Sequence, residues 1–203
     1  MTTGSRSMKN KILFLGILMG AICSCGGNEP ESRLPEETVE CSVDTDEAVD
    51  LGLSVKWAST NVSSYYYYWA DTKALRDYDS YDYEEPFDES ITCYSGSQYD
   101  VARMSWGGSW RTPTSAEWNE LRNKCKIEWD GKGMKVTGSN GASIYLPANA
   151  PYGRYAIYYW SSSRVKGGDW DGSPAAVFIS EFGMTKPDPA HPRSWGRVRP
   201  VCD

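Results

Sequence analysis

The stretch Glu47-Ala48-Val49-Asp50-Leu51-Gly52-Leu53-Ser54-Val55-Lys56-Trp57-Ala58 alternates apolar and polar side chains over most of its length. Such alternation is typical of a β-strand with one face on a core and the other in solvent. We therefore predict a strand over residues 48–58. The preceding residues, from Cys25 onward, are polar, contain prolines and lack apolar periodicity. The folded domain is therefore expected to begin at about residue 47.

One helix is predicted with good local signals after Arg111-Thr112-Pro113. Thr114 or Ser115 can cap its N-terminus, and Glu117 can close a capping box on Thr114. Trp118, Leu121 and Cys125 follow at spacings that place them on one face of this helix.

The remaining elements are expected to be short strands separated by turns. Asn140-Gly141 between two apolar runs is a strong hairpin signal. The strand candidates are residues 134–136, 142–146, 158–161, 175–179 and 198–201. Residues 71–90 are interpreted as a long excursion loop, and the proline-containing residues 182–196 as mostly loop. Together these patterns predict an α+β domain with few helices, short antiparallel strands, long loops and an aromatic core.

Composition excludes several classes of protein. The chain has 203 residues, 40% hydrophobic and 24% charged, which excludes a wholly disordered chain and a polytopic membrane protein. Its net charge of −6 disfavours nucleic-acid binding, because phosphates need a basic face. A single His removes most His-based catalysis and most zinc chemistry. The 9 Trp and 14 Tyr, against 4 Phe, suit binding surfaces and loop-rich cores.

The N-terminus predicts an address outside the cytoplasm. Met8-Lys-Asn-Lys precedes an apolar run, residues 12–21, and then Ile22-Cys23-Ser24-Cys25. A basic start, a short apolar run and small residues before a Cys describe a lipoprotein signal peptide, and the run is too short to span a bilayer. We expect residues 1–24 to be this signal, with 1–7 as an upstream extension. Cys25 is the expected lipidation site, and residues 25–46 are the expected flexible tether to an outer membrane or cell surface.

The other cysteines fit an oxidising compartment. Cys41, Cys93, Cys125 and Cys202 are even in number, and four cysteines allow three pairings that sequence alone does not distinguish. The domain has no C-x-x-C pair, so a metal knuckle or a thioredoxin-like site is not expected.

Several blocks of the sequence together resemble one known family. These blocks occur in the same order as in that family. They are residues 47–58, Trp106-Gly-Gly-Ser-Trp-Arg-Thr-Pro-Thr114 with the helix after it, residues 136–147, Tyr159-Trp-Ser-Ser162 and Gly196-Arg-Val-Arg-Pro-Val201. On these blocks, residues 47–203 resemble the Fibrobacter succinogenes major paralogous domain family. The sequence departs from the family in lacking a Cys near Ala58-Ser59-Thr60-Asn61.

The resemblance implies a single C-type-lectin-like domain related to formylglycine-generating enzymes. It also implies a secreted or surface lipoprotein. For its function we predict a non-catalytic, adhesin- or receptor-like domain that binds a protein or glycan. A first alternative is a receptor diversified by a retroelement, because some relatives vary between the Tyr-Trp-Ser-Ser and Val-Arg-Pro-Val blocks. A second is a formylglycine-generating-enzyme-like oxidase. Because helix-to-last-strand bridges occur in lectin-like folds, the resemblance implies a disulfide between Cys125 and Cys202.

The same resemblance implies where a ligand binds. In lectin-like folds the strands near the C-terminus present loops on one side, and here these loops are residues 164–174 and 183–197. Trp170 and Trp195 lie in polar turns, where exposed rings can stack on sugars or anchor a protein. The candidate ligand-binding residues are Arg164, Lys166, Asp169, Trp170, Asp171, His191, Arg193, Ser194 and Trp195.

No catalytic or metal motif is recognisable. His191 lacks a matched nucleophile, and G-x-S-x-G and H-E-x-x-H are absent. Asp169-Trp170-Asp171-Gly172 resembles a calcium loop only superficially, because its Gly comes too early and Ser180 stands at the twelfth position. The sequence therefore predicts no catalytic residue, no metal and no cofactor.

Overall fold

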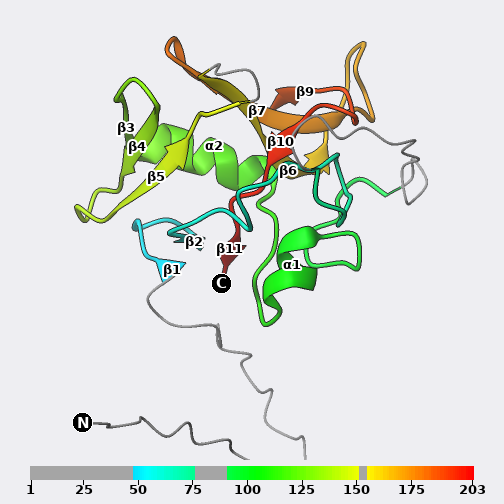
Figure 1. The fold of residues 1–203 in the computed structure, drawn as a ribbon, viewed down its shortest axis with the longest axis horizontal. Coiled ribbons are helices and arrows are strands. Elements are labelled where there is room, and N and C mark those ends of the chain that lie inside the picture. The colour runs from blue at the N-terminus through cyan, green and yellow to red at the C-terminus, as the bar shows by residue number, and fades with distance from the viewer. Residues whose placement is uncertain (1–47, 76–90, 151–154) are drawn as a thin grey trace, which may run out of the picture. The chain divides into compact units, whose positions relative to one another are not determined.

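The computed structural model of the chain describes residues 48–75, 91–150 and 155–203 (Figure 1). The expected signal peptide, the lipidation site Cys25, the tether and most of the expected loop 71–90 lie outside the described residues.

The described residues form two helices and eleven strands, most of them short. The helices are α1 (Val101–Trp106) and α2 (Ser115–Lys124). The strands are β1 (Ala48–Val49), β2 (Lys56–Ala58), β3 (Lys126–Trp129), β4 (Gly133–Thr137), β5 (Ser143–Pro147), β6 (Ala156–Arg164), β7 (Pro174–Ser180), β8 (Gly183–Met184), β9 (Asp188–Pro189), β10 (Gly196–Arg197) and β11 (Val201–Cys202). The predicted class, a small single-domain α+β fold with few helices and mostly antiparallel strands, is confirmed.

The strands form three sheets. One has the order β1-β2-β11, so the last strand of the chain pairs with one of the first. The second has the order β10-β6-β7-β8, with β9 also paired to β7, and the third is the meander β3-β4-β5. Every pairing is antiparallel except that of β10 with β6. Both β6 and β9 therefore pair with β7, and the candidate site lies beside this strand.

Helix α2 begins as the sequence predicts. Thr114 is its N-cap and accepts from the backbone N–H of Glu117, while the Glu117 carboxylate accepts from the backbone N–H of Thr114 at 2.7 Å. Its buried residues are Trp118 and Leu121, and it packs against β6 and β7 (Figure 1). The indole Nε1 of Trp118 donates to the carbonyl of Trp160 at 3.1 Å. The helix is thus fixed to β6 by a buried hydrogen bond as well as by packing.

The core is aromatic, as predicted. The largest fully buried side chains include Trp57, Trp69, Trp110, Trp118 and Trp160. Trp57 and Trp118 pack edge to face with ring centroids 4.7 Å apart. Such rings bury a large area each, and Trp160 also satisfies its indole N–H through the carbonyl of Tyr67 at 2.8 Å.

The predicted continuous strand 48–58 is wrong in detail. The segment forms two strands, β1 and β2, that pair with each other. Gly52 adopts a left-handed conformation, φ +73°, and its N–H donates to the Asp50 carboxylate at 2.7 Å. This local turn reverses the chain where the alternation alone predicted an extended segment.

Other elements also differ from the prediction. The strand expected over 198–201 is reduced to β11, because Pro200 has no N–H and Val198 instead accepts from Val62. The short helix α1 and the strand β3 were not predicted. No helix within the described residues is long and apolar enough to cross a membrane.

Candidate functional site

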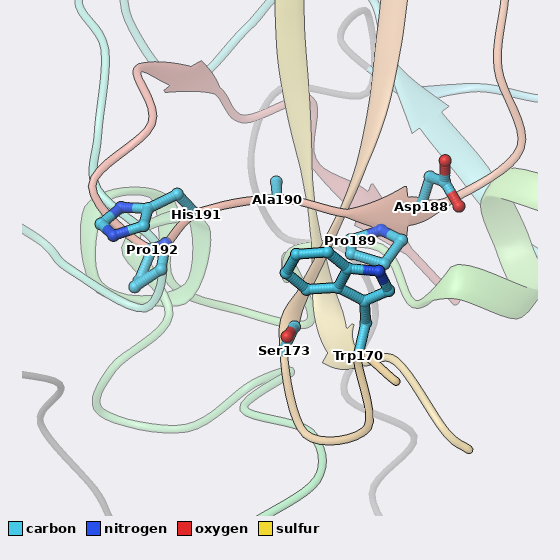
Figure 2. Close-up of a pocket in the computed structure, with 7 residues that line it drawn as sticks. All are labelled: Trp170, Ser173, Asp188, Pro189, Ala190, His191 and Pro192. Carbon is cyan, nitrogen blue, oxygen red and sulfur yellow. The ribbon is translucent and has the colours of Figure 1, made fainter. Parts of the chain in front are cut away.

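A pocket of about 560 Å³ opens beside β7, between the loop that joins β6 to β7 and the segment around β9. Its lining residues are Trp170, Ser173, Asp188, Pro189, Ala190, His191 and Pro192. Trp170 and Ser173 come from the loop, and the other five follow one another along the second segment (Figure 2). The lining is largely apolar with a carboxylate, an imidazole and a hydroxyl, a composition suited to a small-ligand site.

The loop that carries Trp170 is closed by its own backbone. Val165 donates to Ser173 at 2.7 Å, Gly172 to Val165 at 3.0 Å and Ser173 to Trp170 at 3.1 Å. Gly167, Gly168 and Gly172 all have positive φ, which a side chain would strain. The Asp171 carboxylate also accepts from the Gly167 N–H. The indole of Trp170 is therefore presented by a tied turn, and the residue is 65% exposed.

The opposite wall is attached to the core strands. Ala175 and Ala176 of β7 pair with Pro189 and Asp188, and the N–H of Ala190 donates to the carbonyl of Pro174 at 2.9 Å. The carbonyl of Pro192 accepts from the buried Trp69 at 3.0 Å. Both walls are thus anchored through β7 and the aromatic core, so the pocket is largely preformed.

The structure brings some of the predicted ligand-binding residues together. Trp170 and His191, which are 21 positions apart in sequence, line the same pocket. The exposed residues Lys166, Asp169 and Asp171 share the Trp170 loop, and the exposed Arg193 follows the other wall. Ser194 is half-buried, and its N–H donates to the carbonyl of His191 at 2.8 Å. The pocket thus joins the two loops that the sequence singled out.

Arg164 belongs to the scaffold of the loop. Its residue is 5% exposed, its Nε donates to the carbonyl of Ile91 at 3.1 Å, and Nη1 donates to the carbonyl of Gly172. Its guanidinium also lies over the ring of Trp69, 4.6 Å from the centroid. Arg164 therefore closes the base of the loop that presents Trp170 and does not itself line the pocket.

Trp195 also differs from Trp170 in its surroundings. Its ring is half-buried against the main core and stacks on Tyr66, with centroids 6.0 Å apart and planes 26° apart. It is absent from the pocket lining. The two tryptophans that the sequence treats alike therefore occupy different environments.

Five of the residues that line the pocket were not among the predicted ligand-binding residues: Ser173, Asp188, Pro189, Ala190 and Pro192. All five lie within the predicted loops 164–174 and 183–197, so the sequence predicted the loops but not these residues. The pairing of β9 with β7, which places residues 188 and 189 alongside β7, has no local sequence signal.

The predicted disulfide between Cys125 and Cys202 is wrong. Cys125 is a free thiol, whereas Cys202 is disulfide-bonded. Cys125 is the C-cap of α2 and is only half-buried, and burial together with the nearby Glu120 raises its thiol pKa. Cys93 is also free and is exposed, 3.4 Å from the Ser162 hydroxyl.

Within the residues that the structure describes, no group of three or more His, Cys, Asp or Glu side chains is placed to hold a metal ion. In the pocket, the His191 Nδ1 accepts from the N–H of Arg193 at 3.1 Å, which orients the imidazole. The arrangement offers an aromatic face and a few polar groups, which can hold a ligand.

Comparison with protein-family models, with curated proteins and with solved structures finds no match to this chain.

Proposed function

We propose that the chain is a lipid-anchored protein of the outer membrane or cell surface, with a non-catalytic domain that binds a protein or glycan ligand. The pocket between the Trp170 loop and residues 188–192 is its ligand site. The observation that carries this proposal is Trp170, a large aromatic ring 65% exposed on a loop closed by its own hydrogen bonds. Exposed Trp side chains on rigid supports are typical binding hot spots.

The composition of the pocket supports the same role. Trp170, Pro189 and Pro192 supply apolar area, while Asp188, His191 and Ser173 supply polar groups that orient a ligand. A volume of about 560 Å³ lies within the range of small-ligand pockets, roughly 300–1,000 Å³. A sugar ring or the side chains of a protein loop would both use such an aromatic face.

For the fold, we propose the C-type-lectin-like architecture that the family resemblance implies. Two observations support it. The strands at the two ends of the domain pair with each other through β2 and β11, and the resembling blocks fall on β1–β2, α2, β4–β5, β6 and β10–β11. In this architecture the loops after β6 and after β7 form a ligand-binding side.

A retroelement-diversified receptor is a second candidate for one specific reason. All seven residues that line the pocket lie between Ser162 and Val198, the segment that varies in some relatives of the resembling family. The test is the neighbouring DNA. A reverse-transcriptase gene and a near-copy of the segment coding for 160–201 would support diversification, and their absence would exclude it.

The ligand-binding proposal is tested by probing the purified full-length protein against a glycan array and a displayed peptide library. The matched variants are Trp170→Ala and Phe182→Ala, since Phe182 is also an exposed aromatic residue but does not line the pocket. We expect at least one class of hits to be lost in Trp170→Ala and retained in Phe182→Ala. No hit at all, or hits unchanged in Trp170→Ala, would overturn the proposal.

A further inference from the structure

Two buried arginines near the C-terminus have no carboxylate partner within the part of the chain that the structure describes. Arg197 and Arg199 are 4% and 1% exposed. Among the described residues neither forms an ion pair with a carboxylate, although Arg111, Lys124 and Lys126 do. Buried cations are normally paired, because removing a charge from water is costly.

The hydrogen bonds of Arg199 leave part of its guanidinium unsatisfied. Nη1 donates to the carbonyl of Ala58 at 2.9 Å, and Nη2 to the carbonyl of Tyr145 at 2.6 Å. A guanidinium has five N–H donors. The buried Nε of Arg199 has no partner, and the same holds for Nε of Arg197 and Oδ1 of Asn61.

The surroundings make this charge more unfavourable. Burial lowers the pKa of Arg199, the hydroxyl of Tyr159 opposes this effect, and the positive charge of Arg197 adds to it. A guanidinium nevertheless stays protonated in proteins. The positive charge therefore persists, and no carboxylate of residues 48–75, 91–150 or 155–203 forms an ion pair with it.

Arg199 lines a second pocket, of about 440 Å³, that shares no residue with the Trp170 pocket. The lining is rich in hydroxyl groups: Ser59, Thr60, Asn61, Ser63, Ser64, Tyr145, Pro147 and Arg199. Burial and a hydrogen bond to Asp130 raise the pKa of Tyr145 to about 12, so its phenol stays neutral at physiological pH. None of the described residues that line this pocket is negatively charged.

We propose that this second pocket binds the oxyanion group of a small ligand, a carboxylate, phosphate or sulfate. Arg199 supplies the positive charge, and Ser59, Thr60 and Ser64, whose hydroxyls have no partner among the described residues, supply hydrogen-bond donors. The chain as a whole carries a net charge of −6, so this local positive site is not part of a generally basic surface. The inference does not depend on the proposed function of the Trp170 pocket.

The test measures binding of inorganic phosphate, sulfate and acetate to the full-length protein by titration calorimetry at constant ionic strength, with chloride as the reference. Ser64→Asp places a carboxylate at the pocket without altering the core, since Ser64 is exposed. Gln98→Glu adds the same charge at an exposed position outside this pocket. Arg199→Lys keeps the charge but removes the planar donor group.

We expect at least one oxyanion to bind, with acetate indicating a carboxylate site and phosphate or sulfate indicating a site for tetrahedral anions. Ser64→Asp should weaken that binding about tenfold through like-charge repulsion, and Gln98→Glu by less than about twofold because of screening. Arg199→Lys should weaken it as well. Absence of oxyanion binding above the chloride reference would overturn the proposal. Equal effects of Ser64→Asp and Gln98→Glu would overturn it too, because they would indicate a non-specific charge effect.

Discussion

Asp100 is a carboxylate that the fold has removed completely from solvent. Its two oxygens accept from the N–H groups of Gly96 at 2.8 Å, Ala102 at 3.0 Å and Thr112 at 2.8 Å, and from the Thr112 hydroxyl at 2.6 Å. Asp100 thereby caps α1 and joins the segment before this helix to the one that leads into α2. Four hydrogen-bond donors stabilise this buried carboxylate, whereas a buried carboxylate without donors would be strongly unfavourable.

Replacement of Asp100 by Ala should lower the free energy of unfolding by at least about 3 kcal/mol, because it leaves several buried donors unpaired. Asp50→Ala serves as the control, since Asp50 is exposed and accepts one short-range bond from Gly52. That variant should lose less than about 1 kcal/mol. Urea denaturation of both variants measures the difference, and similar losses would show that the Asp100 network is not a stability determinant.

At the scale of elements, Glu120 of α2 holds the turn between β1 and β2. Its carboxylate accepts from the N–H and hydroxyl of Ser54, and from Lys124 at 2.8 Å. The hydrogen bonds from Lys124 and Ser54 lower the pKa of Glu120 below its ordinary value of 4.5. The ionised carboxylate therefore stabilises the fold above that value, and this stabilisation is lost as pH falls through the folded-state pKa.

Glu120→Gln should consequently reduce stability at pH 7, by less than about 1 kcal/mol for this partly solvated pair, and progressively less below pH 4.5. Glu181→Gln, at an exposed carboxylate in the turn between β7 and β8, should have no measurable effect at either pH. Denaturation curves across the pH range provide the comparison. A Glu120→Gln penalty that is unchanged at acidic pH would contradict the assigned role.

Helices and strands that are fixed by residues close to them in sequence were predictable. Those that form only by pairing with distant segments were not. The capping box of Thr114 and Glu117 and the Asn140-Gly141 turn act over a few residues, so α2 and the β4–β5 hairpin were predicted. Helix α1 has Arg103 where a capping box needs Glu or Gln, and it is only six residues long. Strands β9 and β10 are two residues each and exist through pairing with β7 and β6.

The same distinction holds in the candidate site. Trp170 stands among Gly and Asp residues in a turn, and this local composition indicated its exposure. The burial of Arg164 depends on Ile91 and Trp69, more than seventy positions away, and that of Trp195 on Tyr66. Sequence alone therefore identified the two loops but could not separate the scaffold residues from the pocket residues.

At the scale of the whole molecule, Cys202 links the last strand to another part of the chain by a disulfide. Cys93 and Cys125 are free, so neither is its partner. The other cysteines of the sequence are Cys23, Cys25 and Cys41, which lie outside the described residues. If signal cleavage removes Cys23 and a lipid occupies Cys25, only Cys41 remains. We therefore expect a Cys41–Cys202 bridge in the processed protein.

Peptide mapping without reduction should recover Cys41 linked to Cys202. Cys41→Ser and Cys202→Ser should each cost about 2–5 kcal/mol of stability, whereas Cys93→Ser, at an exposed free thiol, should cost little. A bridge from Cys202 to Cys93 or to Cys125 would refute this assignment.

We propose above all that the pocket of Trp170 binds the ligand, whereas Trp195 and the buried aromatic residues stabilise the fold. This proposal is tested most directly by the Kd of Trp170→Ala and Trp195→Ala for the strongest array hit, with the Tm of each variant. We expect Trp170→Ala to lose about 2 kcal/mol or more of binding free energy at nearly unchanged Tm, and Trp195→Ala to have a lowered Tm. A Trp170→Ala variant with a lowered Tm and unchanged Kd would contradict the account.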